Sequence, residues 1–346
     1  MDTRRYFSAV PAEGANETHA RALRFVAPYH VELAAVRLRN LPPGHVLVRA
    51  EFSGISGGTE MLAYRGEIDT KLPRDEALGA LAGTFEYPFA YGYSAVGTVE
   101  TSAGDIGEGE RVFAFHPHQD RFVVATDDVV PVGDSDPRAA TLFPLVETAL
   151  QVSLDAGVRF GEVAAVLGLG PVGILTAILL ARSGATVVAS DPKSWRREIA
   201  QASGLDAVPP AALRDAVDEA TRGRGADVLV EATGSPDALG PALALLAHEG
   251  VAVVASWYGS KPVTLPLGHE FHRRRLELRS SQVSTIGSRA GRWDRTRRLE
   301  TTRELLSVLP LSTLSSHTFP FERAPEAYAA VDRADPELVH AALAYS

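Results

Sequence analysis

Six residues in the middle of the chain form a glycine-rich loop that could bind phosphate. The pattern is Gly168-Leu169-Gly170-Pro171-Val172-Gly173, a G-x-G-x-x-G that directly follows the apolar run 163–167. The first glycine permits a tight turn, the second lets the backbone approach a pyrophosphate, and the third allows close helix–strand packing. The helix that opens here would offer free N–H groups to the phosphates. The pattern therefore predicts a dinucleotide site with contacts from Gly168, Gly170, Pro171, Val172 and Gly173.

An acidic residue stands where the ribose of such a cofactor would lie. Asp191 follows 23 residues after Gly168, at the end of the next apolar run. A carboxylate there accepts ribose hydroxyls and repels a 2′-phosphate, which favours NAD over NADP. Lys193 and Arg196 follow closely, so NADP stays open as the alternative. Thr148 and Thr233 complete the residues that we expect to contact the cofactor.

Length and composition limit the other classes of function. The 346 residues, 45% hydrophobic and 22% charged, fit two folded domains. A formal net charge of −9 argues against nucleic acid as a partner. The absence of cysteine excludes disulfides, thiolate metal sites and cysteine nucleophiles. The N-terminal residues 1–5 lack the apolar core of a secretory signal, so we expect a cytoplasmic protein without a membrane partner.

The first 150 residues read as short strands separated by turns. The segments 31–39, 45–52, 95–101, 111–115 and 121–125 are strand-like and are bounded by Gly-, Pro- and Asp-containing turns. This pattern predicts a compact antiparallel β-domain with few helices.

From about residue 153 strands alternate with helices. Strands are expected at 163–167, 186–190, 227–231, 251–255 and 276–280. Helices are expected at 174–182, 195–203, 212–221 and 238–247, and an Arg-rich helix at 293–308 precedes a short tail that rejoins the first domain. The alternation predicts an α/β fold with a doubly wound parallel sheet of the Rossmann type. The uncharged run 163–181 is long enough to cross a bilayer, but a strand, a turn and a helix explain it better.

Together these features resemble the medium-chain dehydrogenase/reductase family over the whole chain. The resemblance rests on the glycine loop and on Phe52-Ser53-Gly54-Ile55-Ser56-Gly57-Gly58-Thr59-Glu60, Tyr91-Gly92-Tyr93-Ser94-Ala95-Val96-Gly97 and Gly109-Glu110-Arg111-Val112. It implies a GroES-like antiparallel catalytic domain at 1–152 and 285–346, and a Rossmann domain at 153–284. The chain resembles a branch of the family that includes the bacteriochlorophyllide a 2-hydroxyethyl dehydrogenases, and it is also similar to a sugar-oxidising relative.

The resemblance implies that the family's zinc ligands are lost. Its zinc alcohol dehydrogenases carry ligands where this chain has Ser56, Tyr93 and Phe143. Without zinc, hydrogen-bond donors must polarise a carbonyl oxygen and move a proton. The residues that map to the pocket, with Glu147 one helical turn after Phe143, make our catalytic candidates Glu147, Tyr93, His118, Ser56 and Thr59. Glu60 is expected to brace its loop through an ion pair.

Each candidate has an alternative explanation. Tyr93 could be simple packing, and Glu147 could belong to a structural salt bridge. His116, His118 and Glu147 together could form a different metal site. The arginines of 273–298 could form an anion site, although a solvated face or a subunit interface is the simpler explanation.

The sequence thus predicts a zinc-independent, NAD(P)-dependent oxidoreductase that interconverts a secondary alcohol and a ketone on a small substrate. The resemblance further implies a cofactor between the domains and a homodimer in which a second copy pairs through 276–280. Two alternatives stay open: double-bond reduction, as in enoyl and quinone reductases, and nucleotide binding without catalysis.

Overall fold

The computed structural model describes residues 19–38, 40–287 and 290–346, which form two compact units. Unit 1 comprises the described residues up to Leu142 together with His317–Ala334 and Ala341–Ser346. Unit 2 comprises the described residues of Phe143–Ser316 together with Asp335–His340. Each unit has its own sheet and its own apolar core.

The boundaries of these two units differ from the domain boundaries predicted from the sequence. Residues 143–152 and 285–316, which the sequence analysis assigned to the β-domain, lie in unit 2. The reason is packing, because helix α3 (Phe143–Ala156) contacts both α4 (Pro171–Arg182) and α8 (Arg295–Leu305). Helices α3 and α4 bury apolar side chains against the Rossmann sheet, and α8 packs on α3 through its buried residues Arg298 and Thr302, so this packing outweighs their place in the sequence.

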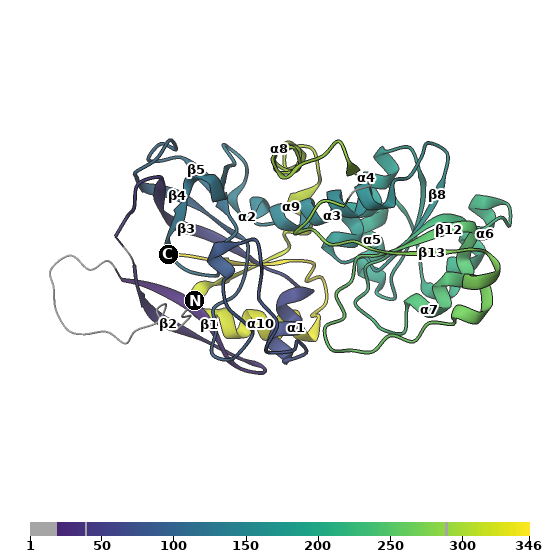
Figure 1. Ribbon diagram of the computed structural model, residues 1–346, viewed down its shortest axis with the longest axis horizontal. Coiled ribbons are helices and arrows are strands. Elements are labelled where there is room, and N and C mark those ends of the chain that lie inside the picture. The colour runs from purple at the N-terminus through teal and green to yellow at the C-terminus, as the bar shows by residue number, and fades with distance from the viewer. Residues whose placement is uncertain (1–18, 39, 288–289) are drawn as a thin grey trace. The chain divides into compact units, whose positions relative to one another are not determined.

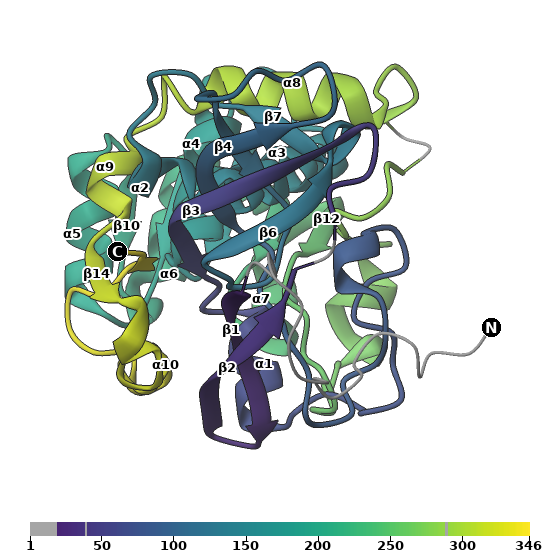
Figure 2. The ribbon, with the colours of Figure 1, turned by 90° about the vertical axis from the view of Figure 1, so that its left-hand side faces the viewer.

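Unit 1 is built on a seven-stranded sheet with the order β14-β15-β3-β4-β5-β7, and β6 also pairs with β3. All of its pairings are antiparallel except β14–β15. A separate hairpin of β1 and β2 projects beside α1 and α10 (Figure 2). The strands are β1 (His19–Ala27), β2 (His30–Arg37), β3 (His45–Ile55), β4 (Ala95–Ser102), β5 (Arg111–Ala114), β6 (Arg121–Ala125), β7 (Val129–Pro131), β14 (His317–Pro320) and β15 (Ala341–Ala344). The helices are α1 (Thr59–Arg65), α2 (Pro137–Ala140) and α10 (Ala324–Arg333).

Unit 2 is a six-stranded parallel sheet with the order β10-β9-β8-β11-β12-β13. Helices α3 and α4 lie on one side of this sheet, and α6 and α7 lie on the other (Figure 1). The strands are β8 (Val163–Leu167), β9 (Thr186–Ser190), β10 (Asp206–Val208), β11 (Ala226–Glu231), β12 (Leu246–Val254) and β13 (Glu277–Ser280). Its remaining helices are α5 (Ser194–Ala202), α6 (Leu213–Thr221), α7 (Leu239–Ala242) and α9 (Leu311–Leu314).

The predicted doubly wound fold is confirmed, and most predicted elements match within three residues. One helix is shorter than expected: 238–247 ends at Leu245, because β12 begins at Leu246 and takes the last apolar residues into the sheet. The uncharged run 163–181 is divided between β8, the glycine loop and α4. Among the described residues no helix is long and apolar enough to cross a membrane.

Candidate active site

The glycine loop has the geometry that its sequence predicts. Gly168 has φ +88°, and a Cβ there would lie 2.6 Å from the carbonyl oxygen of Ala232. A Cβ on Gly173 would lie 1.8 Å from the carbonyl oxygen of Gly168, so only glycine lets α4 pack this closely on the turn. Gly170 differs, because a Cβ there would meet no atom within 4 Å. That open space in front of the first turn of α4 fits a pyrophosphate.

Pro171 and Val172 form the first turn of α4, directly after the N-cap residue Gly170. Proline at this position loses no hydrogen bond, because the first N–H groups of a helix have no partner inside it. Both side chains are half-buried. The free N–H groups of this turn can therefore face an anionic ligand.

Asp191 follows β9 and is almost fully buried. Its carboxylate accepts hydrogen bonds from the backbone N–H of Leu169 and of Lys193, each at 2.8 Å, and Arg196 Nη1 lies 3.4 Å from Oδ2. The carboxylate thus ties the end of β9 to the glycine loop. It has two oxygens with about four acceptor sites, so it keeps capacity for a ribose hydroxyl.

Two buried polar atoms next to Asp191 lack a hydrogen-bond partner within the described part of the chain. They are Ser190 Oγ and Arg196 Nε. Buried polar groups are almost always hydrogen-bonded, so an orphaned hydroxyl and an orphaned N–H beside one carboxylate indicate a ligand site. The residues at the carboxyl ends of β8 and β9 therefore fit the adenosine ribose and pyrophosphate of a dinucleotide.

Thr233 lies after β11, the next strand of the sheet, within a network that the sequence analysis missed. Glu231 is fully buried and accepts hydrogen bonds from the Thr233 N–H, at 2.6 Å, and from the Tyr258 hydroxyl. The Gly234 N–H donates to Ser256 Oγ at 2.8 Å. A charged residue at the end of the apolar strand 227–231 was the available signal for this site. Carboxyl ends of parallel strands are where such folds bind ligands.

Glu147 does not present a free carboxylate. On α3 it pairs with Arg298 of α8, whose Nε donates to Glu147 Oε1 at 2.9 Å, and both side chains are almost completely buried. Arg298 also donates to Gln151 Oε1 at 2.7 Å. Burial raises the pKa of Glu147, and Arg298 opposes this rise. The structure thus favours the structural salt bridge over the catalytic role. The neighbouring Thr148 hydroxyl donates to the carbonyl of Pro144.

In unit 1 Tyr93 lies with Ser56 and Thr59, two of the other candidates. Burial, and then the charge of Glu60, raise the pKa of Tyr93 to about 12, while hydrogen bonds with the Ser56 and Thr59 hydroxyls oppose the rise. Tyr91 packs edge-on against the Tyr93 ring, with the centroids 6.0 Å apart. Tyr93 is therefore a neutral phenol near neutral pH, and it can donate a hydrogen bond to a ligand oxygen.

His118 lies in the interior of unit 1 rather than at a surface. It is fully buried, and both ring nitrogens have partners: Ser53 Oγ lies 2.6 Å from Nδ1, and Glu60 Oε2 lies 2.9 Å from Nε2. Glu60, also fully buried, accepts further hydrogen bonds from the Ser56 N–H and the Tyr328 hydroxyl. Glu60 thus braces this loop as expected, but it does so through hydrogen bonds with Ser56, His118 and Tyr328. The direct contact with substrate that we expected of His118 is not present, because its ring is fully buried inside unit 1.

The alternative metal site is not assembled. His116 stacks on Phe122 with the ring centroids 4.1 Å apart, and its Nδ1 bonds to the carbonyl of Pro117. Burial lowers the pKa of His116 to about 4. His118 and Glu147 are engaged by Glu60 and Arg298, and the described residues contain no cluster of three or more His, Asp or Glu suited to a metal.

The residues at the three positions of the family's zinc ligands, Ser56, Tyr93 and Phe143, do not fit a zinc ion. A buried serine bonded to Glu60, a phenol of raised pKa and the fully buried phenyl ring of Phe143 provide none of the Cys, His or carboxylate donors that zinc prefers. Ser94, adjacent to Tyr93, donates to the carbonyl of Thr141 at 2.6 Å.

Several described arginines of 273–298 are held by local structural partners instead of by a shared anion site. Arg274 donates to the carbonyls of Ala244 and Leu246, Arg275 pairs with Glu249, and Arg279 pairs with Glu277. Arg297 lies over the Trp293 ring, and Arg298 forms an ion pair with Glu147. Arg289 lies outside the described residues. Each described arginine named here thus has a local structural partner.

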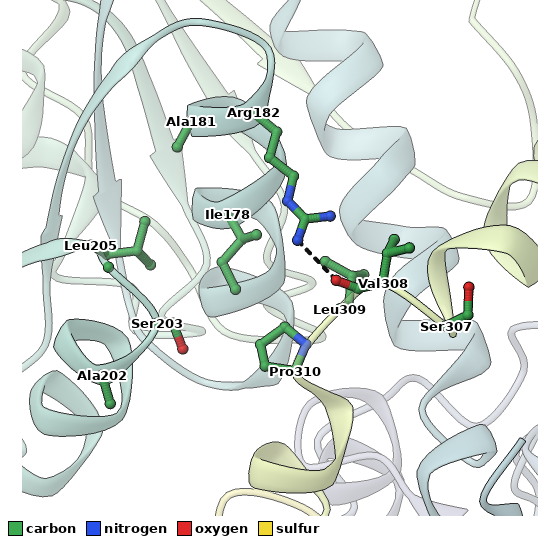
Figure 3. Close-up of a pocket in the computed structure, with 11 residues that line it drawn as sticks. Ile178, Ala181, Arg182, Ala202, Ser203, Leu205, Ser307, Val308, Leu309 and Pro310 are labelled. Carbon is green, nitrogen blue, oxygen red and sulfur yellow. Dashed lines mark hydrogen bonds between the residues drawn. The ribbon is translucent and has the colours of Figure 1, made fainter.

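A hollow of about 600 Å³ lies on unit 2, near the loop after α8 (Figure 3). Apolar residues line it together with Arg182, Ser203 and Ser307. Arg182 is the single titratable residue of that lining, and it donates to the carbonyl of Val308 at 2.9 Å. The hollow therefore lacks groups for chemistry.

Comparison with known proteins places this geometry in a class. Residues 171–300 match the family described as zinc-binding dehydrogenase. The chain is 28% identical to the D-guloside 3-dehydrogenase of Escherichia coli K12, over 87% of this chain and 93% of that one. It is 27% identical to the 2-desacetyl-2-hydroxyethyl bacteriochlorophyllide A dehydrogenase of Cereibacter sphaeroides, over 87% and 91%. A solved structure described as a short chain alcohol dehydrogenase of Escherichia coli CFT073, complexed with NADH, superimposes with a TM-score of 0.76 at 16% identity, over 94% of this chain and 99% of that one.

The fold and these relatives define a dehydrogenase with a Rossmann unit and an antiparallel β unit. The chain is thus similar to zinc-binding dehydrogenases over residues 171–300 and to named dehydrogenases over most of its length, which agrees with the resemblance that its motifs indicated.

Proposed function

We propose that this protein is a zinc-independent, NAD(P)-dependent dehydrogenase that interconverts a secondary alcohol and a ketone on a small polyhydroxylated substrate. The observation that carries the proposal is the Tyr93 phenol at a former metal-ligand position, flanked by the Ser56 and Thr59 hydroxyls and backed by the Glu60 carboxylate. This arrangement supplies a proton donor where relatives of the family use a Lewis acid.

The nicotinamide, when bound, supplies or accepts the hydride. Tyr93 handles the proton. As a neutral phenol it donates a hydrogen bond to the ketone oxygen, and it gives up its proton as negative charge develops there. The proton is replaced through the hydroxyls of Ser56 and Thr59. Gly57 and Gly58 between them are exposed, so this loop offers a route to water.

Glu147 and His118 do not touch the reacting atoms in this proposal. The Glu147 carboxylate balances the buried charge of Arg298, and His118 links Ser53 to Glu60. Both act by holding other groups in place, which corrects the catalytic roles expected from the sequence.

The names of the relatives support the substrate class. One is named for oxidation of a guloside at position 3, and the other for a hydroxyethyl group. Both names describe a secondary alcohol. We therefore propose a hydroxyl of a sugar, glycoside or similar polyol as the reacting group.

The residues that would hold the cofactor are those of unit 2 described above: the glycine loop, Asp191, Arg196 and Thr233. We propose NAD(H) as the preferred form, because the Asp191 carboxylate repels a 2′-phosphate. Arg196 lies 3.4 Å from that carboxylate and could offset the repulsion. Comparison of kcat/KM for the two cofactors decides this point: a higher value with NADP(H) would overturn the preference.

The proposal is tested by assaying Tyr93→Phe and a matched control, Tyr87→Phe, on a panel of glycosides, polyols and simple secondary alcohols. The Tyr87 hydroxyl donates only to the carbonyl of Ala63 in the same unit. We expect Tyr93→Phe to lose about a hundredfold or more in kcat, and the control to keep its rate. Equal rates for both variants would overturn the role of Tyr93. Reduction of enones but not ketones, or cofactor binding without turnover, would favour the two other functions.

The pH dependence of the reaction follows from the pKa of Tyr93. Alcohol oxidation needs the phenolate as base, which is scarce below a pKa of about 12. We expect the oxidation rate to rise about tenfold per pH unit between about pH 7 and pH 10, with ketone reduction unchanged. A plateau in oxidation by about pH 8 would contradict this assignment.

We also propose a homodimer formed through β13. This strand is an edge of the parallel sheet among the described residues, so one side of its backbone is unpaired there. Light scattering tests the state: the mass of two chains supports the proposal, and the mass of one contradicts it.

A further inference from the structure

Glu60 has an unusual position for a carboxylate. It lies in the first turn of α1 and is fully buried, yet it accepts three hydrogen bonds. The donors are the Ser56 N–H at 2.8 Å, His118 Nε2 at 2.9 Å and the Tyr328 hydroxyl. A buried carboxylate is costly unless it is paired and hydrogen-bonded, so the surroundings must hold it in one orientation.

The network continues from His118 to the end of the chain. Ser53 Oγ lies 2.6 Å from His118 Nδ1 and 2.7 Å from the Tyr345 hydroxyl. One consistent set of donors satisfies every bond: Tyr345 donates to Ser53, Ser53 donates to Nδ1, and Nε2–H donates to Glu60. In this set of donors His118 is a neutral imidazole and Glu60 is an acceptor only.

The backbone before Tyr93 fits closely around this network. Gly92 has φ +108°, and a Cβ there would lie 2.5 Å from His118 Cδ2 and 2.6 Å from Nε2. The His118 N–H also bonds to the carbonyl of Tyr91 at 3.3 Å. The imidazole therefore lies directly against the segment that carries Tyr93, while Glu60 holds the loop that carries Ser56.

From this geometry we propose that Glu60 is the positioning residue of the proton-handling site: its buried carboxylate fixes the Ser56–Thr59 loop against Tyr93 and keeps the proton on the phenol. The inference rests on the proposed function and deepens it, because it names the group that sets when Tyr93 can act as a base.

The charge of Glu60 acts on the phenols around it. Its effect raises the pKa of Tyr91, Tyr93, Tyr328 and Tyr345, in each case after the larger effect of burial. Arg74 opposes it at Tyr91, while Asp75 and Asp120 add to the negative charge at Tyr91 and Tyr345. At Tyr93 itself the opposing effect comes from the hydroxyls of Ser56 and Thr59, which lower the pKa. Of the two effects that raise the pKa of Tyr93, burial and the Glu60 charge, the Glu60 charge is the one that a single substitution removes.

Two substitutions separate the effect of the Glu60 charge from the effect of the length of its side chain. Glu60→Gln keeps the shape and removes the charge, so the pKa of Tyr93 should fall below that of the wild type. Glu60→Asp keeps the charge but is one methylene shorter, so it cannot hold the Ser56 N–H and His118 together. Glu100→Gln is the control, because Glu100 forms ion pairs with Arg49 and Arg121 away from this network in the same unit.

The experiment measures alcohol oxidation against pH, and the titration of the Tyr93 ring carbon by NMR in the free protein, assigned with Tyr93→Phe. We expect Glu60→Gln to shift both the NMR titration and the rise in oxidation rate to lower pH. Glu60→Asp should keep the wild-type pH dependence and lose about tenfold to a hundredfold in kcat. The control should change neither readout.

Unchanged titration and pH profile in Glu60→Gln, or an unchanged kcat in Glu60→Asp, would overturn the inference. If Glu60→Gln does not fold, Glu60→Asp alone still decides, since a normal kcat there excludes a positioning role. The two proposals fail separately. A wild-type rate in Tyr93→Phe removes the proposed function, while the NMR titration still tests the effect of Glu60 on Tyr93.

Discussion

The buried ion pair between Glu147 and Arg298 makes a quantitative prediction. The change is Arg298→Met, which keeps much of the side-chain volume and removes the charge. Arg298 and Glu147 are 3% and 4% exposed, so the remaining carboxylate would have no access to water. Removing one partner of a buried pair costs about 3–5 kcal/mol. Gln151 Oε1 also loses its donor, so we expect unit 2 to lose about 4 kcal/mol of stability.

The size of this loss depends on pH in a defined direction. Burial already raises the pKa of Glu147 and Arg298 lowers it, so Arg298→Met raises it further. As the pH rises through the ordinary value of 4.5, the carboxyl ionises in the unfolded state first. The unfolded state is then favoured increasingly up to the raised pKa. The destabilisation by Arg298→Met should therefore be smaller at pH 5 than at pH 8.

The assay is urea unfolding followed by tryptophan fluorescence at both pH values. All three tryptophans, Trp195, Trp257 and Trp293, lie in unit 2, so the signal reports on the unit that contains the pair. The double variant Glu147→Leu, Arg298→Met should recover most of the loss, because it removes both charges. A loss below about 1 kcal/mol for Arg298→Met would refute the buried pair. Full stability of the double variant with abolished turnover would restore a catalytic role to Glu147.

Two further predictions concern the described residues of unit 2. Gly173→Ala should lower both stability and affinity for NADH, because its Cβ would clash with the Gly168 carbonyl, whereas Gly170→Ala should weaken only NADH binding. Fluorescence titration with NADH, beside the melting temperature, checks this pair, and equal behaviour of the two variants would contradict the loop geometry. Burial lowers the pKa of His340 to about 4, and its Nδ1 has no hydrogen-bond partner in the described part of the chain. The unfolded state therefore binds a proton first as the pH falls below 6.5, so stability is lost between about pH 6.5 and pH 4, by up to about 3 kcal/mol. His340→Phe should flatten this loss in urea unfolding, with the exposed His30→Asn as the control; an unchanged slope would be evidence against the buried imidazole as its cause.

The Rossmann sheet was predictable because its signals are local. Strands β8 and β9 coincide with the predicted ranges, and α4 begins at the glycine loop as expected. Each is specified by a short apolar run bounded by glycine or a charged residue. By contrast, residues 246–247 fit either a helix or a strand locally, and pairing with β11 decides for β12.

The site was predictable only in part because its contacts are long-range. The motif positions identify Tyr93, Ser56 and Thr59, which the structure brings together. Nothing in the local sequence indicates that Tyr328 and Tyr345 reach Glu60 and Ser53, since 268 and 292 residues separate the partners. For the same reason the spacing of Glu147 on its helix could not reveal Arg298, which lies 151 residues further on.

The central claim is that Tyr93, and not a metal ion, acts on the substrate oxygen. The most direct test is the zinc content of the protein after dialysis against a chelator, measured by mass spectrometry together with the rate of ketone reduction. The proposal predicts less than about a tenth of an equivalent of zinc per chain with an undiminished rate. About one equivalent in the untreated protein, with activity lost on chelation and restored by zinc, would contradict it.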